Sequence, residues 1–595
     1  MYTNFEKEKD ITSLTTFGIP TKARLFADYS SIKELTAISR TPEFTDNEVL
    51  HIGGGSNLLF VNNFNGLVLH SSIKGIVRYE KNEDTVYAIA GAGEKWSDFV
   101  EWCISQGLGG VENLAGIPGE VGASAVQNIG AYGVEAKDVI HNVECFDTVA
   151  RRTVTFENHE CRYAYRDSFF KHEGKDRYYV TRVSFRLHKD ETARSLEYGP
   201  LKDLAQRIGH TPTIREVADE IVKIRNQKLP DPAVTGSAGS FFKNPEVSRY
   251  FFEEMMLALN PDIPSYPLGD NKVKIPAGWL IEHAGMKGHR IGGAEVYPKQ
   301  CLVIANAGGA TAKDVTDLSR LIVRKVREQF GIVLSPEVNF IDTSIEVTIL
   351  GSGTSKGVPE VACACPVCRS ESRFDKRLRA SALVRTHGME ILIDASPDFR
   401  EQALSLDLYH LDAALITHSH YDHVGGIDDL RPYCCEGNFP LYLKKDVNDD
   451  LHKRLDYCFR DHLYPGVPSF DMHEVSDSPF YINGLKIVPI RIMHGKLPIL
   501  GYRIGDLAYI TDAKTIPEEE FDKLEGLKAL VINALRHREH FAHLSLKEAL
   551  DLIERIKPEE AYLTHFNHEI GFHADLEKSL PPHVHPCYDG LTFKI

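Results

Sequence analysis

The sequence predicts a multidomain chain of mixed helices and strands, made of two parts with different chemistry. It has 595 residues, more than the roughly 250–300 at which a single core stops growing, so three or four domains are expected. Of the 26 histidines, nine precede position 343 and seventeen lie in the last 253 residues. This boundary coincides with PEVNFIDTSIEVTILGSGTS (residues 336–355), which begins with a carboxylate beside β-formers and ends as an apolar strand that runs into glycines.

Charge and composition narrow the choice of partners. The net charge of -16 repels phosphate backbones, which argues against a nucleic-acid polymer and favours small anions bound in local basic pockets. Residues 1–14 hold no signal-peptide core, and no run of about 18 apolar residues follows, so we expect no membrane insertion and a cytoplasmic protein. The eleven cysteines lack framework spacing and are expected to be reduced thiols or metal ligands.

A glycine loop at residues 53–57 is the first functional pattern. The apolar strand EVLHI leads into Gly53, Gly54 and Gly55, which are followed by Ser56 and Asn57. Glycine removes the Cβ, so successive N–H groups can converge on a phosphate, and the serine and asparagine add side-chain donors. A tight strand connection explains these glycines equally well when the loop is considered alone.

A second loop, GIPGEVGASAVQNIGAYG (residues 116–133), strengthens the prediction of a dinucleotide site. It has little helix or strand periodicity, and its candidate cofactor-binding residues are Gly119, Gly122, Ser124, Gln127 and Asn128. Neither loop has the Gly-x-Gly-x-x-Gly turn that opens a dinucleotide fold of the nicotinamide type. We therefore expect a different architecture to hold the phosphates.

Seven motifs in the first part resemble one enzyme family. In chain order they are GGGSNLLF, NLAGIPGEVGASAVQNIGAYGVE, CRYAYRDSFFKHE, IRNQKLPDP, GSAGSFFKNP, AGWLIEHAGMKG and PEVNFI. From about Phe5 to Ile341 they are similar to the UDP-N-acetylenolpyruvoylglucosamine reductases, flavoenzymes of peptidoglycan precursor synthesis. The resemblance implies an α+β fold with an FAD-binding PCMH-type region at residues 1–205 and a substrate-binding domain at residues 206–342. It also implies FAD as cofactor, NADPH as reductant and a UDP-sugar as substrate.

Catalytic roles in the first part follow from this resemblance. Hydride transfer to an enolpyruvyl ether builds negative charge next to a carboxylate, where Arg166 and Glu337 are implied, with Ser240 as proton donor. Taken singly, these residues read as a surface ion pair, a strand end and a turn hydroxyl, and a flavin-binding redox sensor is a rival function. The implied substrate-contacting residues are Tyr165, Tyr198, Lys228, Asn244 and Gln300. Tyr198 lies in an inserted segment that is expected to close over substrate.

The second part carries a metal motif, THSHYDHVGGIDDLR (residues 417–431), after the apolar strand DAALI. His418 and His420 alternate at the end of this strand and therefore point the same way. Asp422 and His423 lie just beyond and can reach a second ion about 3.5–4 Å from the first. Surface histidines on a loop are the plain alternative, but four such ligands in a strand–turn–helix context favour a metal site.

This pattern is the signature of the metallo-β-lactamase superfamily, which implies an αββα fold. The remaining ligands are found in IRIMHG, AYITDA and AYLTHFNHE, each after a short apolar strand. Imidazole and carboxylate ligands suit zinc or manganese. By resemblance, one divalent ion is held by His418, His420 and His494, the other by Asp422, His423 and His565, and Asp512 bridges them.

A cysteine cluster, CACPVC, suits a third, structural zinc ion. Cys363, Cys365 and Cys368 can supply three thiolates to a tetrahedral ion. His568, three residues after His565, can supply the fourth ligand. Buried reduced thiols without a metal are the alternative.

Four segments, ILGSGTSKGVP, CACPVC, LIDASPDFR and LTHFNHE, resemble the phosphodiesterase branch of the superfamily, in particular the cyclic phosphodiesterases of phosphonate breakdown, over about residues 344–595. His543 in AHLSLKEA is then implied as a phosphate contact or as the acid for the leaving oxygen, with His537 and His540 as competing candidates. The tRNA 3′-processing endonucleases share the ligands, but no Lys-, Arg- and Gly-rich arm is evident. We therefore expect a small phosphodiester substrate, and a scaffold or binding module is the remaining alternative.

The whole chain is thus predicted to be a fusion of a flavin-dependent reductase, residues 1–342, with a dinuclear-metal hydrolase, residues 343–595. The stretch PEVNFIDTSIEVTILGSG supplies a catalytic carboxylate to the first enzyme and the opening strand to the second. With so short a connection the two enzymes are expected to touch, although no shared substrate follows from that.

Overall fold

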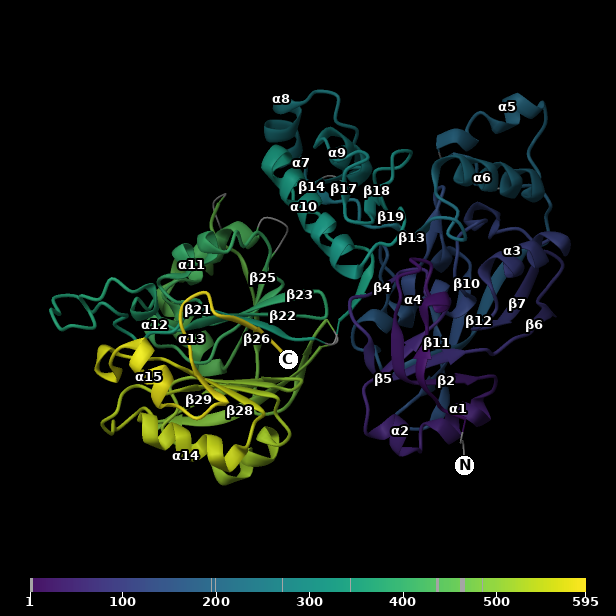
Figure 1. The fold of residues 1–595 in the computed structure, drawn as a ribbon. Coiled ribbons are helices and arrows are strands. Elements are labelled where there is room, and N and C mark those ends of the chain that lie inside the picture. The colour runs from purple at the N-terminus through teal and green to yellow at the C-terminus, as the bar shows by residue number, and fades with distance from the viewer. Residues whose placement is uncertain are drawn as a thin grey trace. The chain divides into compact units, whose positions relative to one another are not determined.

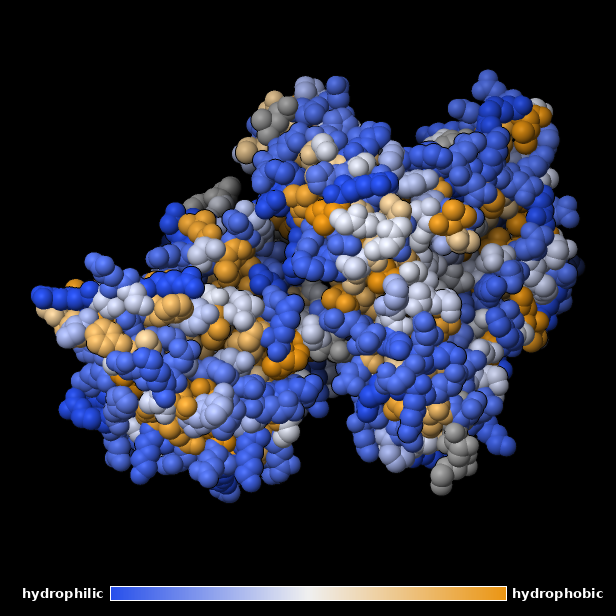
Figure 2. All heavy atoms as spheres, in the orientation of Figure 1, coloured by the Kyte–Doolittle hydropathy of each residue, from blue (hydrophilic) through white to orange (hydrophobic). Residues whose placement is uncertain are grey.

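The computed structural model describes residues 4–193, 195–197, 199–269, 271–342, 344–434, 438–460, 466–483 and 485–595. Contacts divide the chain into two compact units, Met1–Thr343 and Ser344–Ile595, whose ribbons are drawn in Figure 1. Tyr198, implied above as a substrate contact, lies outside the described residues. No helix in the described part of the chain is long and apolar enough to cross a membrane. Hydrophilic side chains cover most of the visible surface of each unit (Figure 2).

Two sheets form the N-terminal portion of the first unit. The smaller sheet has the order β1-β2-β5-β3, and β2, β5 and β3 run parallel. Its strands are β1 (Glu6–Asp10), β2 (Lys22–Tyr29), β3 (Val49–Ile52) and β5 (Phe64–Ser71). The larger sheet is antiparallel and has the order β11-β10-β12-β7-β6. Its strands are β6 (Ile76–Glu80), β7 (Thr85–Gly91), β10 (Ile140–Asp147), β11 (Arg152–Glu157) and β12 (Tyr178–His188).

Helices cover one face of the larger sheet because its strands alternate. In β7, Val86, Ala88 and Ala90 are buried while the residues between them are half-buried, which is the period of two expected of a strand. The helices that pack on this core are α3 (Trp96–Ser105), α4 (Val121–Gln127) and α6 (Ile214–Lys228). Since Val217 and Ile221 of α6 belong to this core, packing assigns α6 to the first core, whereas the sequence places a domain boundary at residue 205.

A second core closes the first unit. It is built on the sheet β13-β19-β18-β17 together with two helices, α9 (Ala277–His283) and α10 (Ala312–Phe330). The strands are β13 (Gly236–Ser240), β17 (Arg290–Ile291), β18 (Ala294–Val296) and β19 (Val303–Asn306). Helix α10 begins at a capping box formed by Thr311 and Asp314 and ends at Gly331, whose φ is 70°, so both ends carry standard stop signals.

A parallel pair of short strands connects the two portions of the first unit. Strand β20 (Asn339–Ile341) runs beside β4 (Leu58–Phe60), which directly follows the first glycine loop. This pairing brings Glu337, two residues before β20, to the first glycine loop although 280 residues separate it from Asn57.

The second unit is a sandwich of two seven-stranded sheets. The first has the order β26-β25-β24-β23-β22-β21-β34 and the second β27-β28-β29-β30-β31-β32-β33. The strands of the first are β21 (Glu346–Gly351), β22 (Ser381–Thr386), β23 (Met389–Ile393), β24 (Ala413–Leu415), β25 (Phe439–Leu443), β26 (Phe470–Glu474) and β34 (Thr592–Lys594). Those of the second are β27 (Phe480–Ile482), β28 (Leu485–His494), β29 (Leu497–Ile504), β30 (Leu507–Ile510), β31 (Ala529–Asn533), β32 (Glu560–Thr564) and β33 (Val584–Pro586).

Alternation along buried strands produces four layers. In β31, Ala529 and Val531 face the core between the sheets, whereas Leu530 and Ile532 face the core under α14 (Leu546–Ile556). On the far side, α11 (Phe399–Ser405), α12 (Tyr421–Val424) and α13 (Lys445–Arg454) border the core of the first sheet. Figure 1 shows α14 along β28 and β29 and α11 on the opposite side of the unit. The layers are therefore helix, sheet, sheet, helix, as the sequence predicts.

Burial predicts how strongly this sandwich depends on single side chains. Leu563 in β32 is 0% exposed and lies two residues before His565. We expect Leu563→Ala to lower the free energy of unfolding by about 2–5 kcal/mol because it leaves a cavity. Leu404→Ala, at a side chain that is 63% exposed on α11, should change it by less than about 0.5 kcal/mol. Guanidinium denaturation followed by circular dichroism checks both, and equal losses would contradict the assigned packing.

Candidate functional sites

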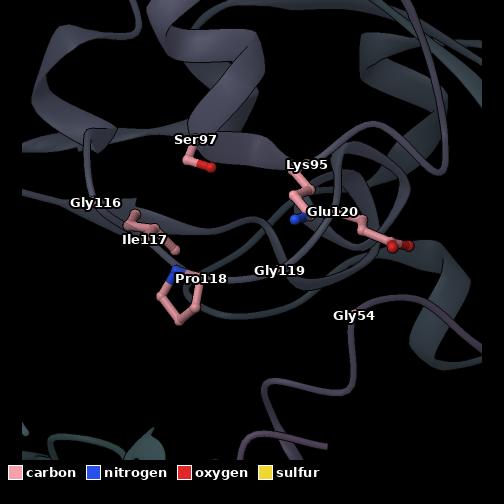
Figure 3. A pocket seen from close by; sticks show the side chains of 8 residues that line it. All are labelled: Gly54, Lys95, Ser97, Gly116, Ile117, Pro118, Gly119 and Glu120. Atoms are coloured by element: carbon pink, nitrogen blue, oxygen red, sulfur yellow. The ribbon is translucent and has the colours of Figure 1, made fainter. Parts of the chain in front are cut away.

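The two predicted glycine loops touch each other at the edge of the small parallel sheet. A Cβ on Gly54 would lie 3.2 Å from the Cα of Gly119, and the Ser56 hydroxyl donates to the carbonyl of Pro118 at 3.3 Å. Between them lies a hollow of about 280 Å³, shown in Figure 3. It is lined by Gly54, Lys95, Ser97, Gly116, Ile117, Pro118, Gly119 and Glu120. The loops therefore form a half-open cradle of backbone and small side chains.

Several of the predicted cofactor-binding residues hold the loops themselves. Asn57 donates from Nδ2 to the carbonyl of Glu337 at 3.0 Å. The Ser124 hydroxyl donates to Val121 within α4, and the Asn128 amide donates to Glu135 and to the carbonyl of Ala164. Glycine is needed at two further positions. A Cβ would lie 2.8 Å from Ala92 Cβ at Gly122, and 3.3 Å from a Glu120 oxygen at Gly53.

One predicted cofactor-binding residue keeps a free acceptor. Gln127 Oε1 at the end of α4 is buried and has no hydrogen-bond partner among the described residues. A buried amide oxygen without a partner is costly unless a ligand supplies the donor. This position therefore suits a ligand that donates a hydrogen bond.

The structure joins the predicted arginine and glutamate of the first unit. Arg166 Nε donates to Glu337 Oε1 at 2.8 Å, and the two side chains are 20% and 15% exposed. Arg166 adopts φ 55°, a strained conformation for a residue other than glycine. Its guanidinium also donates to the carbonyl of Gly130 at 2.5 Å. Ser240 ends β13, and the next carbonyl, of Phe241, accepts from the Glu337 amide at 2.8 Å. The three predicted catalytic residues thus lie on backbone segments that are bonded to one another.

The predicted substrate residues occupy different parts of the first unit. Tyr165 lies under two cations, with Lys274 Nζ 3.6 Å from its ring centre, and burial raises its pKa. Asn244 accepts at Oδ1 from the Ala277 amide at 2.9 Å. Gln300 accepts at Oε1 from the Leu302 amide at 3.3 Å, and Lys228 is exposed at the end of α6.

The left-handed glycine of the first loop yields a test of the cradle. A Cβ on Gly55 (φ 56°) would lie 1.8 Å from the Leu14 carbonyl oxygen, so Gly55→Ala must move the loop. We expect the variant to retain less than about a tenth of the bound flavin, measured by absorbance of the purified protein. Gly18→Ala is the control because Gly18 has φ 64° but open space around it. Equal flavin retention in both variants would contradict the cradle.

The second unit gathers its predicted ligands around one carboxylate. Asp512 Oδ2 lies 3.6 Å from His418 Nε2, and Oδ1 lies 3.5 Å from His423 Nε2 and 2.8 Å from His565 Nε2. Asp512 and His565 have φ values of 54° and 60° directly after β30 and β32. Three groups have ligand atoms within 4.8 Å of one another: Asp422, His423, Asp512 and His565; His418, His420 and Asp512; and His494, Asp512 and His543.

Outer hydrogen bonds fix the ring orientations of two histidines. His423 Nδ1 lies 2.6 Å from Asp394 Oδ2, and His494 Nδ1 lies 2.9 Å from the Asp512 carbonyl and 3.0 Å from the Ala542 carbonyl. Each histidine therefore presents Nε2 to the centre, as metal-ligating histidines do.

The inner donors fit divalent metal ions. His423 Nε2 is buried without a hydrogen-bond partner among the described residues, although an Asp422 oxygen lies 3.2 Å away. Burial opposes ionisation of Asp422, but the neighbouring His423 and His565 outweigh it and lower the Asp422 pKa. Ionised carboxylates and ring nitrogens that face one point without hydrogen bonds suit a shared cation. His420 is exposed, so the centre opens to solvent on that side.

His543 lies at this centre, whereas the competing candidates are less central. His543 Nδ1 is 4.0 Å from Asp512 Oδ2, and its ring stacks on that of His565 at 5.0 Å. Burial lowers the His543 pKa to about 3, which keeps the ring neutral. His540 is 5.1 Å from His543 between ring centres, and His537 lies 3.1 Å from the Ile570 carbonyl.

The cysteine cluster converges on His568 as predicted. Cys363, Cys365 and Cys368 sulfurs lie 3.3, 3.7 and 3.3 Å from His568 Nδ1. The backbone amides of Glu360 and Cys368 donate to the sulfurs of Cys368 and Cys365, both at 3.4 Å. Amide donation favours the thiolate form. Three sulfurs and one imidazole nitrogen are the donor set of a structural zinc ion.

Removing one thiolate should abolish metal binding at the cysteine cluster. Cobalt bound by thiolates gives an intense sulfur-to-metal absorption band, which we expect in the cobalt-reconstituted wild type and expect to be lost in Cys368→Ser. Cys434→Ser serves as control because Cys434 is half-buried and outside the cluster. A band that survives Cys368→Ser unchanged would contradict the assigned ligand set.

Sequence reasoning missed residues that the fold adds from a distance. Asp394 stands in the quoted motif LIDASPDFR, but its bond to His423 depends on the pairing of β23 with β24. Lys171 stands in the motif CRYAYRDSFFKHE and donates to the Arg166 carbonyl at 3.0 Å. Burial lowers the Lys171 pKa, and the nearby Lys243 adds to the effect. A buried lysine within five residues of a catalytic arginine was the available signal.

Family models match three segments of the chain. Residues 23–152 match the FAD binding domain, and residues 231–341 match the C-terminal domain of UDP-N-acetylenolpyruvoylglucosamine reductase. Residues 389–566 match the beta-lactamase superfamily domain. The resemblances and the fold classes predicted from the sequence motifs are thereby confirmed.

Individual relatives match either part of the chain. The UDP-N-acetylenolpyruvoylglucosamine reductase of Neisseria gonorrhoeae is 47% identical over 343 residues, 57% of this chain and 98% of that protein. The Bacteroides fragilis enzyme is 46% identical over 336 residues, 56% of this chain and 100% of that protein. The solved diphosphatase of the PhnP family has a TM-score of 0.41 and is 36% identical, covering 43% of this chain and 98% of its own.

Proposed function

Because this chain belongs to the UDP-N-acetylenolpyruvoylglucosamine reductase family through its first unit and carries a metallo-β-lactamase fold in its second, we propose that it joins this reduction to metal-dependent hydrolysis of a small phosphodiester. The reductase uses FAD, and NADPH is the proposed reductant. The proposed metals are two zinc or manganese ions at the Asp512 centre and one structural zinc ion at the cysteine cluster.

The reductase role is supported by the fixed pair of Arg166 and Glu337. Bound FAD supplies the hydride. The chain's own task is to stabilise the negative charge that then develops beside the substrate carboxylate, and to protonate the neighbouring carbon. Arg166 is a permanent cation held by Glu337 and by backbone carbonyls, so no reorganisation is needed when the charge forms. Ser240 is the proposed proton donor because its strand is bonded to the Glu337 segment.

The hydrolase role is supported above all by one observation, that Asp512 lies within ligand reach of three groups of donors. Bound divalent ions activate water and neutralise the phosphate in the transition state. The chain's residues orient the site: Asp394 and two backbone carbonyls fix His423 and His494. His543 is the proposed group that contacts the phosphate or the leaving oxygen, because it borders the centre without a structural ion pair of its own.

Two other functions for the second unit fit less well. A scaffold or binding module would not need this many buried donors aimed at one point, since each costs free energy unless it is paired. A tRNA 3′-processing endonuclease must hold a polyanion, which the net charge of -16 opposes.

Ser240→Ala tests the reductase roles. Loss of a general acid should lower the rate of substrate-dependent turnover by roughly 10²–10⁴, while NADPH still reduces the flavin at the wild-type rate in a stopped-flow half-reaction. Ser237→Ala on the same strand is the control. If Ser240→Ala turns over substrate at the wild-type rate, Ser240 is not the proton donor.

Asp512→Asn tests the hydrolase independently. The variant should hydrolyse bis-p-nitrophenyl phosphate at least about a hundredfold more slowly, because loss of even an outer ligand partner costs 10–100-fold, and its flavin reduction should be unchanged. Asp522→Asn, at an exposed residue of the same unit, is the control. An unchanged hydrolysis rate in Asp512→Asn would refute the metal assignment.

A further inference from the structure

Three parallel strands end side by side where the first glycine loop begins. In the register of the sheet, His70 of β5 is the partner of Asp28 in β2 on one side and of Ile52 in β3 on the other. Gly53, the first residue of the glycine loop, directly follows Ile52. His70 therefore lies at the carboxyl ends of the strands, next to the root of the loop.

A chain of side chains links these strands to the second glycine loop. His70 Nδ1 lies 2.9 Å from Asp28 Oδ1, and His70 Nε2 lies 3.2 Å from Glu120 Oε1. The Ser72 hydroxyl donates to both oxygens of Asp28 at 2.8 and 2.7 Å. Glu120 is the residue between Gly119 and α4, so this chain fastens the second loop to the sheet edge from which the first loop leaves.

The chain is electrically coherent at neutral pH. Burial disfavours a charged His70, but its bonds to Asp28 and Glu120 outweigh burial and raise the His70 pKa to about 9. Burial likewise opposes ionisation of Asp28, while His70 and Ser72 lower its pKa. His51 on the neighbouring strand β3 is buried with a pKa of about 3 and stays neutral. An imidazolium thus stands between two carboxylates.

Glu120 also sets the gap between the loops. Its Oε2 is buried without a hydrogen-bond partner among the described residues, and it would lie 3.3 Å from a Cβ on Gly53. Figure 3 shows the Glu120 carboxylate turned away from Ile117 and Pro118. Because the carboxylate packs against the root of the first loop, any rotation of Glu120 would shift one glycine loop against the other.

We propose that Asp28, His70 and Glu120 are positioning residues of the cofactor site, and that their carboxylate–imidazolium–carboxylate chain holds the two glycine loops at the spacing that the flavin dinucleotide requires. This inference rests on the proposed FAD-dependent function of the first unit. The three residues do not need to touch the cofactor. They act by fixing the backbone N–H groups that converge on its phosphates.

Cofactor affinity of the full-length apoprotein tests this inference, measured by quenching of FAD fluorescence. Replacing one partner leaves the other charge buried and unpaired, so His70→Gln and Glu120→Gln should each raise the Kd for FAD roughly ten- to hundredfold. Asp28→Asn should have a smaller effect because Asp28 is 48% exposed. The control is His210→Gln, which removes another His–Glu pair, 3.0 Å from Glu216, outside both loops and should leave the Kd unchanged.

The pH profile supplies a readout that general loss of stability would not reproduce. The His70 pKa is raised in the folded state, so its contribution is present at neutral pH and is lost as pH rises through about 9. The wild-type Kd for FAD should therefore rise between pH 8 and 10, as an order-of-magnitude window around that value, and the profile should be flat in His70→Gln.

The outcomes separate this inference from the proposed function. If the wild type fails to bind FAD at neutral pH, the function itself is refuted. If the wild type binds FAD but His70→Gln and Glu120→Gln bind it equally well, the positioning role is overturned. Should His70→Gln not fold by circular dichroism, Glu120→Gln and the wild-type pH profile decide, and a flat wild-type profile with an unchanged Glu120→Gln Kd overturns the role.

Discussion

Burying imidazole and carboxylate groups without a full set of protein hydrogen bonds is the constraint on which the second unit depends. His418, His423, Asp512 and His565 are all at most 2% exposed, and together they would be costly in an apolar core. The fold accepts them because they face a common point. Two of the donors leave the strand ends in left-handed backbone conformations, so the sandwich carries local strain exactly where a cation would repay it.

The first unit meets a similar constraint with protein partners alone. Arg166 is strained in its backbone, yet its side chain is held by Glu337 and a carbonyl, and its own carbonyl by Lys171. The glycine loops contribute space and backbone N–H groups, and a separate set of charges fixes where those groups point. In both units, therefore, the reactive groups lie at strand ends, and residues that are distant in sequence hold them in place.

Local spacing explains what the sequence could predict. The His-x-His-x-Asp-His run and the three clustered cysteines are readable because their ligands follow one another within a few residues, and the strand context supplies the rest. The assignments of His494, Asp512, His565 and His568 depended on resemblance, and the structure brings all four to the expected clusters. Layer order was equally readable from alternation in strands such as β31.

Long-range contacts explain what the sequence could not predict. His70 is unremarkable in a strand until sheet register places it between Asp28 and the second glycine loop. Asp394 gains its role only through strand pairing, and α6 joins the first core although it follows the expected boundary at residue 205. Each of these depends on which strands or helices become neighbours, which no local pattern encodes.

One measurement addresses the central claim that a single chain carries two reaction centres. A single purified sample of the full-length protein is assayed for NADPH oxidation that depends on UDP-N-acetylenolpyruvoylglucosamine, and for hydrolysis of bis-p-nitrophenyl phosphate that depends on added zinc or manganese. Both activities should be present and should co-elute on size exclusion. Reductase activity without any metal-dependent hydrolysis, in a sample that demonstrably binds metal, would contradict the account and leave the second unit a scaffold.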